Sequence, residues 1–327
     1  LNAKCSLMVK PGDQVLAGQL IGEPQSFTAA PLHASVSGIV REVKKISSQD
    51  REILACVIER TGEPEEKSFP HENEAADISE YSEDVIIEGL LTGGLIGMGG
   101  AGFPVHKKYE TEKRIDTILI NGAECELFLT CDCRVMVEQG YGVINGTRLM
   151  LKASGADQAY ICIEDNKPDA IKNLQKILEE MKSQGYFEKE KPVQVQVLPT
   201  KYPQGGERQL IESVLGREVP MGGLPADVGV IVSNVGTAKA AADVVLGKKP
   251  LISRIVTVTG NVKEPGNYLV PIGTSAKELI QLCGGVTTPS NRVIAGGPMT
   301  GPCAAVNWDG ESELFYVTKS TSGILVL

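Results

Sequence analysis

The chain has 327 residues, a net charge of −9 at pH 7 and 42% hydrophobic residues. A chain of this length buries sizeable cores and predicts two or three domains. Its acidic balance, without a basic run, excludes a nucleic-acid partner, because neutralising many phosphates needs an excess of Lys and Arg. No apolar run approaches the ~20 residues that span a bilayer, and the first residues lack a secretory pattern. We therefore expect a cytoplasmic protein whose membrane contact, if any, is peripheral.

Residues 1–62 are expected to form a small all-β unit. Short β-branched runs alternate there with Gly-Asp and Ser-Gly turns, which is typical of strands and hairpins. The segment resembles lipoyl and biotinyl barrel-sandwich domains, but residues 22–34 contain no lysine that could carry a prosthetic arm. We expect a structural or docking unit, followed by an acidic, Pro-containing linker at 63–82.

Residues 83–250 are expected to form an α/β domain. A Ser-Glu-Asp start at 82–84 and apolar residues at helical spacing predict a helix that leads into a cluster of glycines. Beyond it, apolar strand-like runs alternate with amphipathic segments, as a mostly parallel sheet requires. The predicted strands are 117–120, 158–163, 193–198 and 228–232, and the predicted helices are 135–153, 168–184, 206–215 and 238–246.

Residues 251–327 contain two β runs joined by a turn at 263–267, then a helix at 275–282 and a Gly-Gly turn. This order resembles the β-grasp module called the SLBB domain. The chain stops on the apolar run at 322–327, where natural chains seldom end, so we expect the natural protein to continue. The fold class predicted is thus multidomain α/β and β.

The richest segment for chemistry is residues 97–109. Gly97, Gly99 and Gly102 satisfy the dinucleotide pattern G-x-G-x-x-G, but the segment before them is helical, whereas a Rossmann site needs a strand there. Consecutive glycines let backbone N–H groups face an anion or a flat ring, and a helix beginning near Pro104 would direct its positive end at a phosphate. The alternative is a tight turn that packs two helices.

Three further polar or glycine-rich loops follow predicted strands, at 121–126, 201–207 and 233–237. Ligands of open α/β sheets bind outside the carboxyl ends of the strands. Asn121, Glu124 and Glu126 are therefore placed for polar recognition, with a solvated loop as the alternative. Convergence of all the loops on one crevice predicts a cofactor site.

These four segments, in this order, resemble the flavin subunit of respiratory complex I and, more closely, the C subunits of Rnf electron-transport complexes and their relatives, including the electron carrier of proline reductase. The matching motifs are G-x-G-G-A-G-F-P…K at 97–108, N-G-A-E-C-E at 121–126, Y-P-x-G-G-E at 202–207 and N-V-G-T at 234–237. The resemblance covers nearly the whole chain, because the order of barrel, flavin domain and SLBB domain also matches.

The resemblance implies FMN and NADH as cofactor and substrate. The residues it assigns to FMN are Gly97, Gly99, Gly100 and Gly102 around the cofactor, Lys108 and Asn121 as polar contacts, Tyr202 beside the ring, and Asn234 and Thr237 at the phosphate. It assigns Phe103 to the NADH adenine, and Glu126 and Glu207 to the nicotinamide side. No side chain is expected to act as a general acid or base, because the cofactor carries the redox chemistry.

The chain departs from the family pattern at several positions. Leu127 replaces a proline, Cys133 replaces an aspartate, and Met98 stands where complex I has an arginine. The Rnf family's C-x-x-C-x-x-C-x-x-x-C-P runs do not occur in these residues, so [4Fe–4S] clusters are expected only in a C-terminal segment beyond them. Cys125, Cys131 and Cys133 lie close in sequence, but a fourth ligand is lacking nearby, and we expect reduced thiols without a metal.

The function predicted is that of an NADH:acceptor oxidoreductase subunit, which oxidises NADH through FMN and passes electrons to iron–sulfur clusters. Its expected partners are NADH and the other subunits of an electron-transfer complex, which would hold it at the cytoplasmic face of a membrane. Two alternatives remain open. The chain could be a non-catalytic scaffold with a degenerate glycine loop, or a related NADH-dependent carrier for proline reductase or cobalamin.

Overall fold

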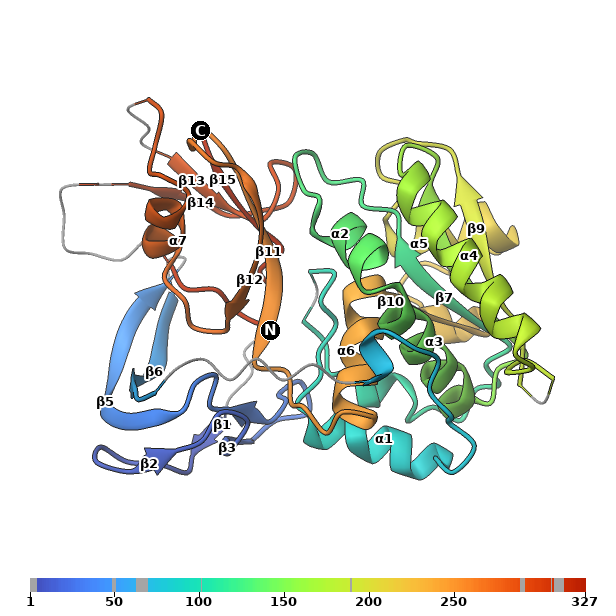
Figure 1. The fold of residues 1–327 in the computed structure, drawn as a ribbon, viewed down its shortest axis with the longest axis horizontal. Coiled ribbons are helices and arrows are strands. Elements are labelled where there is room, and N and C mark those ends of the chain that lie inside the picture. The colour runs from blue at the N-terminus through green and yellow to red at the C-terminus, as the bar shows by residue number, and fades with distance from the viewer. Residues whose placement is uncertain are drawn as a thin grey trace.

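A computed structural model of the chain describes residues 5–48, 51–62, 70–100, 102–188, 190–288, 292–306, 308 and 315–327. Figure 1 shows two β-rich units, coloured blue and orange to red, side by side on one flank, with a larger α/β unit on the other. The predicted multidomain α/β and β fold is confirmed.

The N-terminal unit is built from two three-stranded sheets with strand orders β1-β3-β4 and β2-β5-β6. Its small core consists of Val15, Ile21, Ala34 and Val40. The strands are β1 (Cys5–Leu7), β2 (Gln14–Val15), β3 (Leu20–Pro24), β4 (Leu32–His33), β5 (Gly38–Ser48) and β6 (Arg51–Arg60).

The central unit has four parallel strands in the order β10-β7-β8-β9. The register places Asn234 at the end of β10 directly beside Asn121 at the end of β7. The strands are β7 (Thr117–Gly122), β8 (Gln158–Glu164), β9 (Val193–Leu198) and β10 (Val230–Asn234). The helices are α1 (Glu83–Thr92), α2 (Cys131–Glu138), α3 (Gly140–Ser154), α4 (Pro168–Ser183), α5 (Glu207–Leu215) and α6 (Val235–Val245), with short 3₁₀ turns η1 (Pro70–Glu72), η2 (Val105–Lys108) and η3 (Pro225–Val228).

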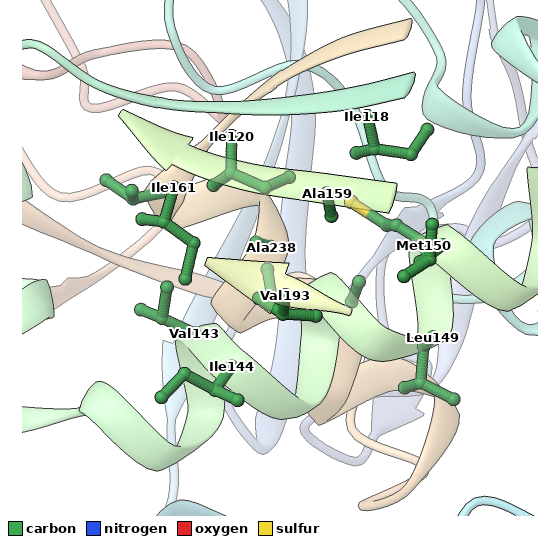
Figure 2. Close-up of a cluster of buried hydrophobic side chains, with 14 of the residues drawn as sticks. Ile118, Ile120, Val143, Ile144, Leu149, Met150, Ala159, Ile161, Val193 and Ala238 are labelled. Atoms are coloured by element: carbon green, nitrogen blue, oxygen red, sulfur yellow. The ribbon is translucent and has the colours of Figure 1, made fainter. Parts of the chain in front are cut away.

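Alternate residues of the strands pack on opposite faces of this sheet. Figure 2 shows Ile161 of β8 extending toward Val143 of α3. Ile118, Ile120, Ile161, Val143 and Ile144 are all fully buried in one hydrophobic cluster. On the other face, a separate cluster joins the sheet to α5. Burying each Ile contributes about 1.5–3 kcal/mol, so the two covered faces hold the strand ends in fixed positions.

Two predictions about helices of this unit were wrong. The single helix expected at 135–153 is two helices, because the backbone breaks at Gln139 (φ −126°, ψ 33°). Gly140 follows the break, and a Cβ there would lie 2.7 Å from Asn173 Nδ2 and Ile177 Cδ1 of α4. The helix expected near Pro104 is only the four-residue 3₁₀ turn η2.

The C-terminal unit is a five-stranded sheet with the order β12-β11-β15-β13-β14, covered by α7. Ser275 caps α7, its Oγ accepting a hydrogen bond of 3.3 Å from the Glu278 N–H. The elements are β11 (Ser253–Gly260), β12 (Gly266–Pro271), α7 (Ala276–Leu282), β13 (Arg292–Ala295), β14 (Cys303–Ala305) and β15 (Gly323–Val326).

One buried lysine joins all three units. Lys319 of the C-terminal unit donates hydrogen bonds of 2.7 Å to the carbonyls of Pro31 in the barrel and Gly94 in the α/β unit. Burial lowers the pKa of Lys319 to about 8. Thr130, before α2, also bonds to Asn267 of β12, so the C-terminal sheet is held against the α/β unit.

Candidate functional site

A cavity of about 430 Å³ opens where β7 and β10 end, between the α/β unit and the C-terminal sheet. Loops that follow the strands of an open sheet commonly form such a crevice. The residues predicted for the site that line it are Gly99, Gly100, Asn121, Glu124, Glu126, Tyr202 and Asn234. All four predicted loops therefore contribute to one cavity.

The glycine loop gives the cavity a bare backbone wall. Gly100 has φ +116°, a conformation that side-chain-bearing residues rarely adopt, and open space faces its missing Cβ. A Cβ on Gly99 would lie 3.2 Å from the Asn234 Cβ. The loop is fixed by the Met98 N–H, which donates to Thr237 Oγ1 at 2.9 Å. Peptide groups can thus be approached closely by a ligand.

Asn121 joins two of the loops. Its Nδ2 donates to the Gly205 carbonyl at 2.8 Å, and its Oδ1 accepts from the Ala123 N–H at 3.1 Å. A Cβ on Gly205 would lie 2.3 Å from the Ala123 oxygen, so this approach requires glycine. Tyr202 lies half-exposed at the cavity. The Asn121 amide therefore fixes the loop at 201–207 over the end of β7.

Two carboxyl groups lie at the N-terminal ends of α2 and α6. Glu124 Oε1 accepts from the Asp132 N–H at 2.9 Å and Oε2 from the Cys133 N–H at 3.2 Å, so Glu124 caps α2. Asp132 Oδ2 accepts from Asn234 Nδ2 at 2.6 Å. Burial, reinforced by the charge of Asp132, raises the pKa of Glu124 to about 7, although the backbone N–H groups oppose this rise.

Glu126 lies at the cavity, where its carboxylate holds a loop of the C-terminal unit. Its Oε1 accepts hydrogen bonds from the N–H groups of Met299 (3.0 Å) and Thr300 (2.9 Å) and from Thr300 Oγ1 (3.1 Å). A Cβ on Gly297 would lie 1.9 Å from Glu126 Cγ. The assignment of Glu126 to the nicotinamide stays a prediction, but this carboxylate already has three donors.

Six of the predicted residues do not line the cavity, namely Gly97, Gly102, Phe103, Lys108, Glu207 and Thr237. Lys108 donates from Nζ to the Val232 carbonyl, and burial lowers its pKa while Glu207 opposes that shift. The ring of Phe103 faces Phe27 of the barrel, with centroids 6.1 Å apart. Thr237 supports the glycine loop through Met98.

The sequence prediction missed the opposite wall, which belongs to the C-terminal unit. This wall comprises Ala295, Gly296, Gly297, Thr300, Gly301, Pro302, Thr318, Ser320, Thr321 and Ser322. Its signal in the sequence was a second glycine cluster, Gly-Gly-Pro-Met-Thr-Gly-Pro at 296–302, which has the same character as the cluster at 97–102. Cys125 and Cys131, expected as plain thiols, also line the cavity.

Two residues next to cavity-lining positions carry buried polar atoms without hydrogen-bond partners among the described residues. In the part of the chain that the structure describes, both amide atoms of Gln204 and the hydroxyl of Ser233 are buried and unpaired. Gln204 lies between Pro203 and Gly205, which line the cavity. Each unpaired buried group costs about 1–3 kcal/mol. Bare peptide walls beside amide and hydroxyl groups fit a flat ring that carries both donors and acceptors.

Comparisons with protein families agree with this class of site. Residues 91–243 match the Nuo51 FMN-binding domain, 255–302 the SLBB domain and 1–63 the RnfC barrel sandwich hybrid domain. An NAD+-reducing [NiFe]-hydrogenase in its H2-reduced state has the same fold, with a TM-score of 0.66 at 22% identity over 76% of this chain and 47% of that chain. The chain is thus an electron-transfer protein with an FMN-binding domain.

Its relatives define the family more closely. The C subunit of the Na+-translocating ferredoxin:NAD+ oxidoreductase complex of Acetobacterium woodii is 39% identical over 100% of this chain and 71% of its own length. The corresponding protein of the proton-translocating complex of Clostridium ljungdahlii is 41% identical, with 100% and 68% covered. That of the ion-translocating complex of Rhodobacter capsulatus is 36% identical, with 100% and 61% covered. The chain belongs to the Rnf complex C-subunit family, which confirms the resemblance seen in its motifs.

Among the described residues, no helix combines the length and the apolar character that a membrane crossing requires.

Proposed function

We propose that this chain oxidises NADH through an FMN bound in the cavity and passes the electrons to iron–sulfur clusters. The observation that carries the proposal is the glycine wall at Gly99 and Gly100, opposed by amide side chains of Asn121 and Asn234. Such a site leaves peptide groups open to a planar ring. FMN supplies the conversion of a two-electron hydride donor into single electrons.

Each wall of the cavity has a separate task in this proposal. Peptide N–H groups of Gly99 and Gly100 would contact the ring and its phosphate chain, and Asn121 would keep the loop at 201–207 at a fixed distance. Asn234 caps α6 by accepting from the Gly236 N–H at 2.8 Å, so the first turn of α6 is in place for a phosphate. Tyr202 would cover the exposed side of the ring.

NADH is assigned to the side of the cavity nearer the barrel. Phe103 would receive the adenine, and Glu207, at the first position of α5, would address the nicotinamide side. Clusters that receive the electrons would lie in a further segment or in another subunit of the complex. Association with those subunits would bring the chain to the cytoplasmic face of a membrane.

The direct test is reconstitution with FMN, followed by addition of NADH. We expect a yellow complex that NADH bleaches, whereas a non-catalytic scaffold would stay colourless. Gly99→Val and Gly100→Val should each abolish FMN binding, because a side chain would occupy the space of the ring. Circular dichroism and thermal melting of each variant check that the fold is retained.

Gly12→Val is the matched control for Gly100→Val. Gly12 in the barrel has φ +96° with nothing within 4 Å of a built Cβ, so its backbone strain is similar and it is remote from the cavity. It should bind FMN normally. Normal FMN affinity in Gly100→Val would count against the site, and equal loss in both variants would mean that strain alone is responsible.

A further inference from the structure

Two carboxyl groups of the cavity wall lie close together without a cation between them. One carboxylate oxygen of Glu124, one of Asp132 and the Cys131 Sγ all lie within 4.8 Å of one another. Their donors are two N–H groups of α2, the Cys131 thiol and the Asn234 amide. Within the described ranges, neither carboxylate forms an ion pair at 4.0 Å or less. Two like charges at this spacing favour the sharing of one proton.

The charged groups that face the pair are few. Lys167, before α4, and Arg254, on β11, both favour the ionised form of Asp132, and Lys167 does the same for Glu124. The thiols of Cys131 and Cys133 lie on the same turn of α2. Burial outweighs both cations, because it raises the pKa of each carboxyl group above its ordinary value. Both carboxyl groups therefore hold a proton more strongly than a solvated carboxyl group does, and the pKa of Glu124 is raised to about 7.

We propose that Glu124 and Asp132 form a proton-accepting pair that takes up one proton when electrons enter the cavity and returns it when they leave. This inference rests on the proposed binding of FMN. A hydride from the donor adds two electrons and one proton, so it brings a net negative charge into the cavity. That charge raises the proton affinity of nearby carboxylates. One carboxylate oxygen then forms an O–H bond with a proton from water, and this bond breaks when the electrons depart.

The geometry allows the pair to respond without moving. Glu124 is held by two backbone N–H groups and Asp132 by Asn234, so the oxygens stay at the cavity in either protonation state. Asn234 caps α6 and bonds to Asp132, and it lies beside Gly99 across the cavity wall. A carboxyl pair fixed in this way offsets charge with little rearrangement of the protein.

The first test uses FMN-free protein and infrared spectroscopy. In the wild type, the carbonyl band of a protonated carboxyl group should disappear with a midpoint near neutral pH. Glu124→Gln and Asp132→Asn should each shift that midpoint to the ordinary range or remove the band. Asp116→Asn is the matched control, because Asp116 is paired with Arg217 at the opposite end of β7. A wild type with no carboxyl band above about pH 5.5 would overturn the proposal.

The second test counts protons during reduction of the FMN-loaded protein. Photochemical reduction without NADH, in weakly buffered dye solution near pH 7, should take up as much as one more proton per FMN in the wild type than in Asp132→Asn. Equal uptake in the two proteins would overturn the inference. If Glu124→Gln fails to fold because the cap of α2 is weakened, Asp132→Asn still decides. If FMN does not bind at all, the proposed function fails while the infrared titration still judges the pair.

Discussion

Two partly buried acidic clusters of the α/β unit contain similar residues but differ in one partner. His71, Glu72 and Asp243 cluster beside α6, and the Nζ of Lys239 lies 2.8 Å from Asp243 and 3.3 Å from Glu72. Burial raises the pKa of Asp243, but hydrogen bonds and charge from His71 and Lys239 outweigh it and bring that pKa below its usual value. The pair Glu124 and Asp132 lacks such a cation.

The difference shows that acidic residues in a cluster do not define its role. Where an ammonium lies between the carboxylates, the cluster stays ionised and ties η1 to α6. Where backbone N–H groups, the Asn234 amide and the Cys131 thiol donate, burial raises the pKa of both carboxyl groups, to about 7 for Glu124, which suits a site through which charge passes. The first cluster also lies outside the cavity, whereas the second lines it.

The largest effect on stability is expected from a change at Lys239. Lys239→Met should cost about 3–5 kcal/mol of unfolding free energy, because Asp243 and Glu72 lose their buried cation. Denaturant unfolding measures this loss. Lys176→Met is the control, since Lys176 is exposed and pairs with Glu180 at 3.6 Å on the surface of α4, and it should cost less than about 1 kcal/mol. A similar loss in both variants would contradict the assigned role.

Lys319 extends the comparison to a buried cation that has only carbonyl partners. Lys319→Met should cost about 2 kcal/mol, because the carbonyls of Pro31 and Gly94 lose their donor. The pKa of Lys319 lies at about 8 in the folded chain, below its ordinary value. The wild type should therefore gain stability as pH rises from 8 toward 10.5, and the variant should lack this gain. Unfolding measured at pH 7, 8.5 and 10 checks the slope.

Asp132→Asn tests the second cluster, the one without a lysine between its carboxylates. The pKa of Glu124 is raised to about 7 in the folded chain. Its protonated form therefore stabilises the fold fully below the unfolded pKa, and this stabilisation is lost as the pH rises through about 7. Removing the charge of Asp132 should lower the pKa of Glu124 and reduce that loss by about 1 kcal/mol. Thermal melting between pH 5 and 8 measures the change. An unaltered pH dependence would show that Asp132 does not act on Glu124.

The smallest expected effect concerns Glu126. Glu126→Gln keeps an oxygen for Met299 and Thr300 but removes the charge, so the loop at 297–301 should loosen by under about 1 kcal/mol. Amide hydrogen exchange at Met299 and Thr300 should become several-fold faster. Glu278→Gln on α7 is an exposed control that should leave those amides unchanged. If exchange is equal in all three proteins, Glu126 does not hold the loop.

Much of the α/β unit could be predicted from local patterns. The runs at 117–120, 158–163 and 193–198 are apolar enough to read as strands, and they lie within the parallel strands β7, β8 and β9. Helix starts were less visible where a distant carboxylate supplies the cap. Glu124 caps the polar first turn of α2, and no periodicity marks that turn, so the expected start at 135 was too late.

The composition of the cavity wall depended on contacts between distant residues. Glu126 and Thr300 are 174 positions apart, and nothing local in either segment indicates that they meet. The loops after β7 and β10 could be predicted to converge, because strand ends of one sheet share an edge. The loop at 295–302 comes from another sheet, so no rule of strand order placed it at the cavity.

The three-way contact of Lys319 has a consequence for chimeric proteins. One ammonium satisfies carbonyls contributed by the barrel and by the segment after α1. A barrel or β-grasp segment grafted from a relative without a matching amine would leave one or both of these buried peptide oxygens without a hydrogen-bond donor at the junction. Exchange of whole segments between homologues should therefore keep this lysine and the backbone course at Pro31 and Gly94 together.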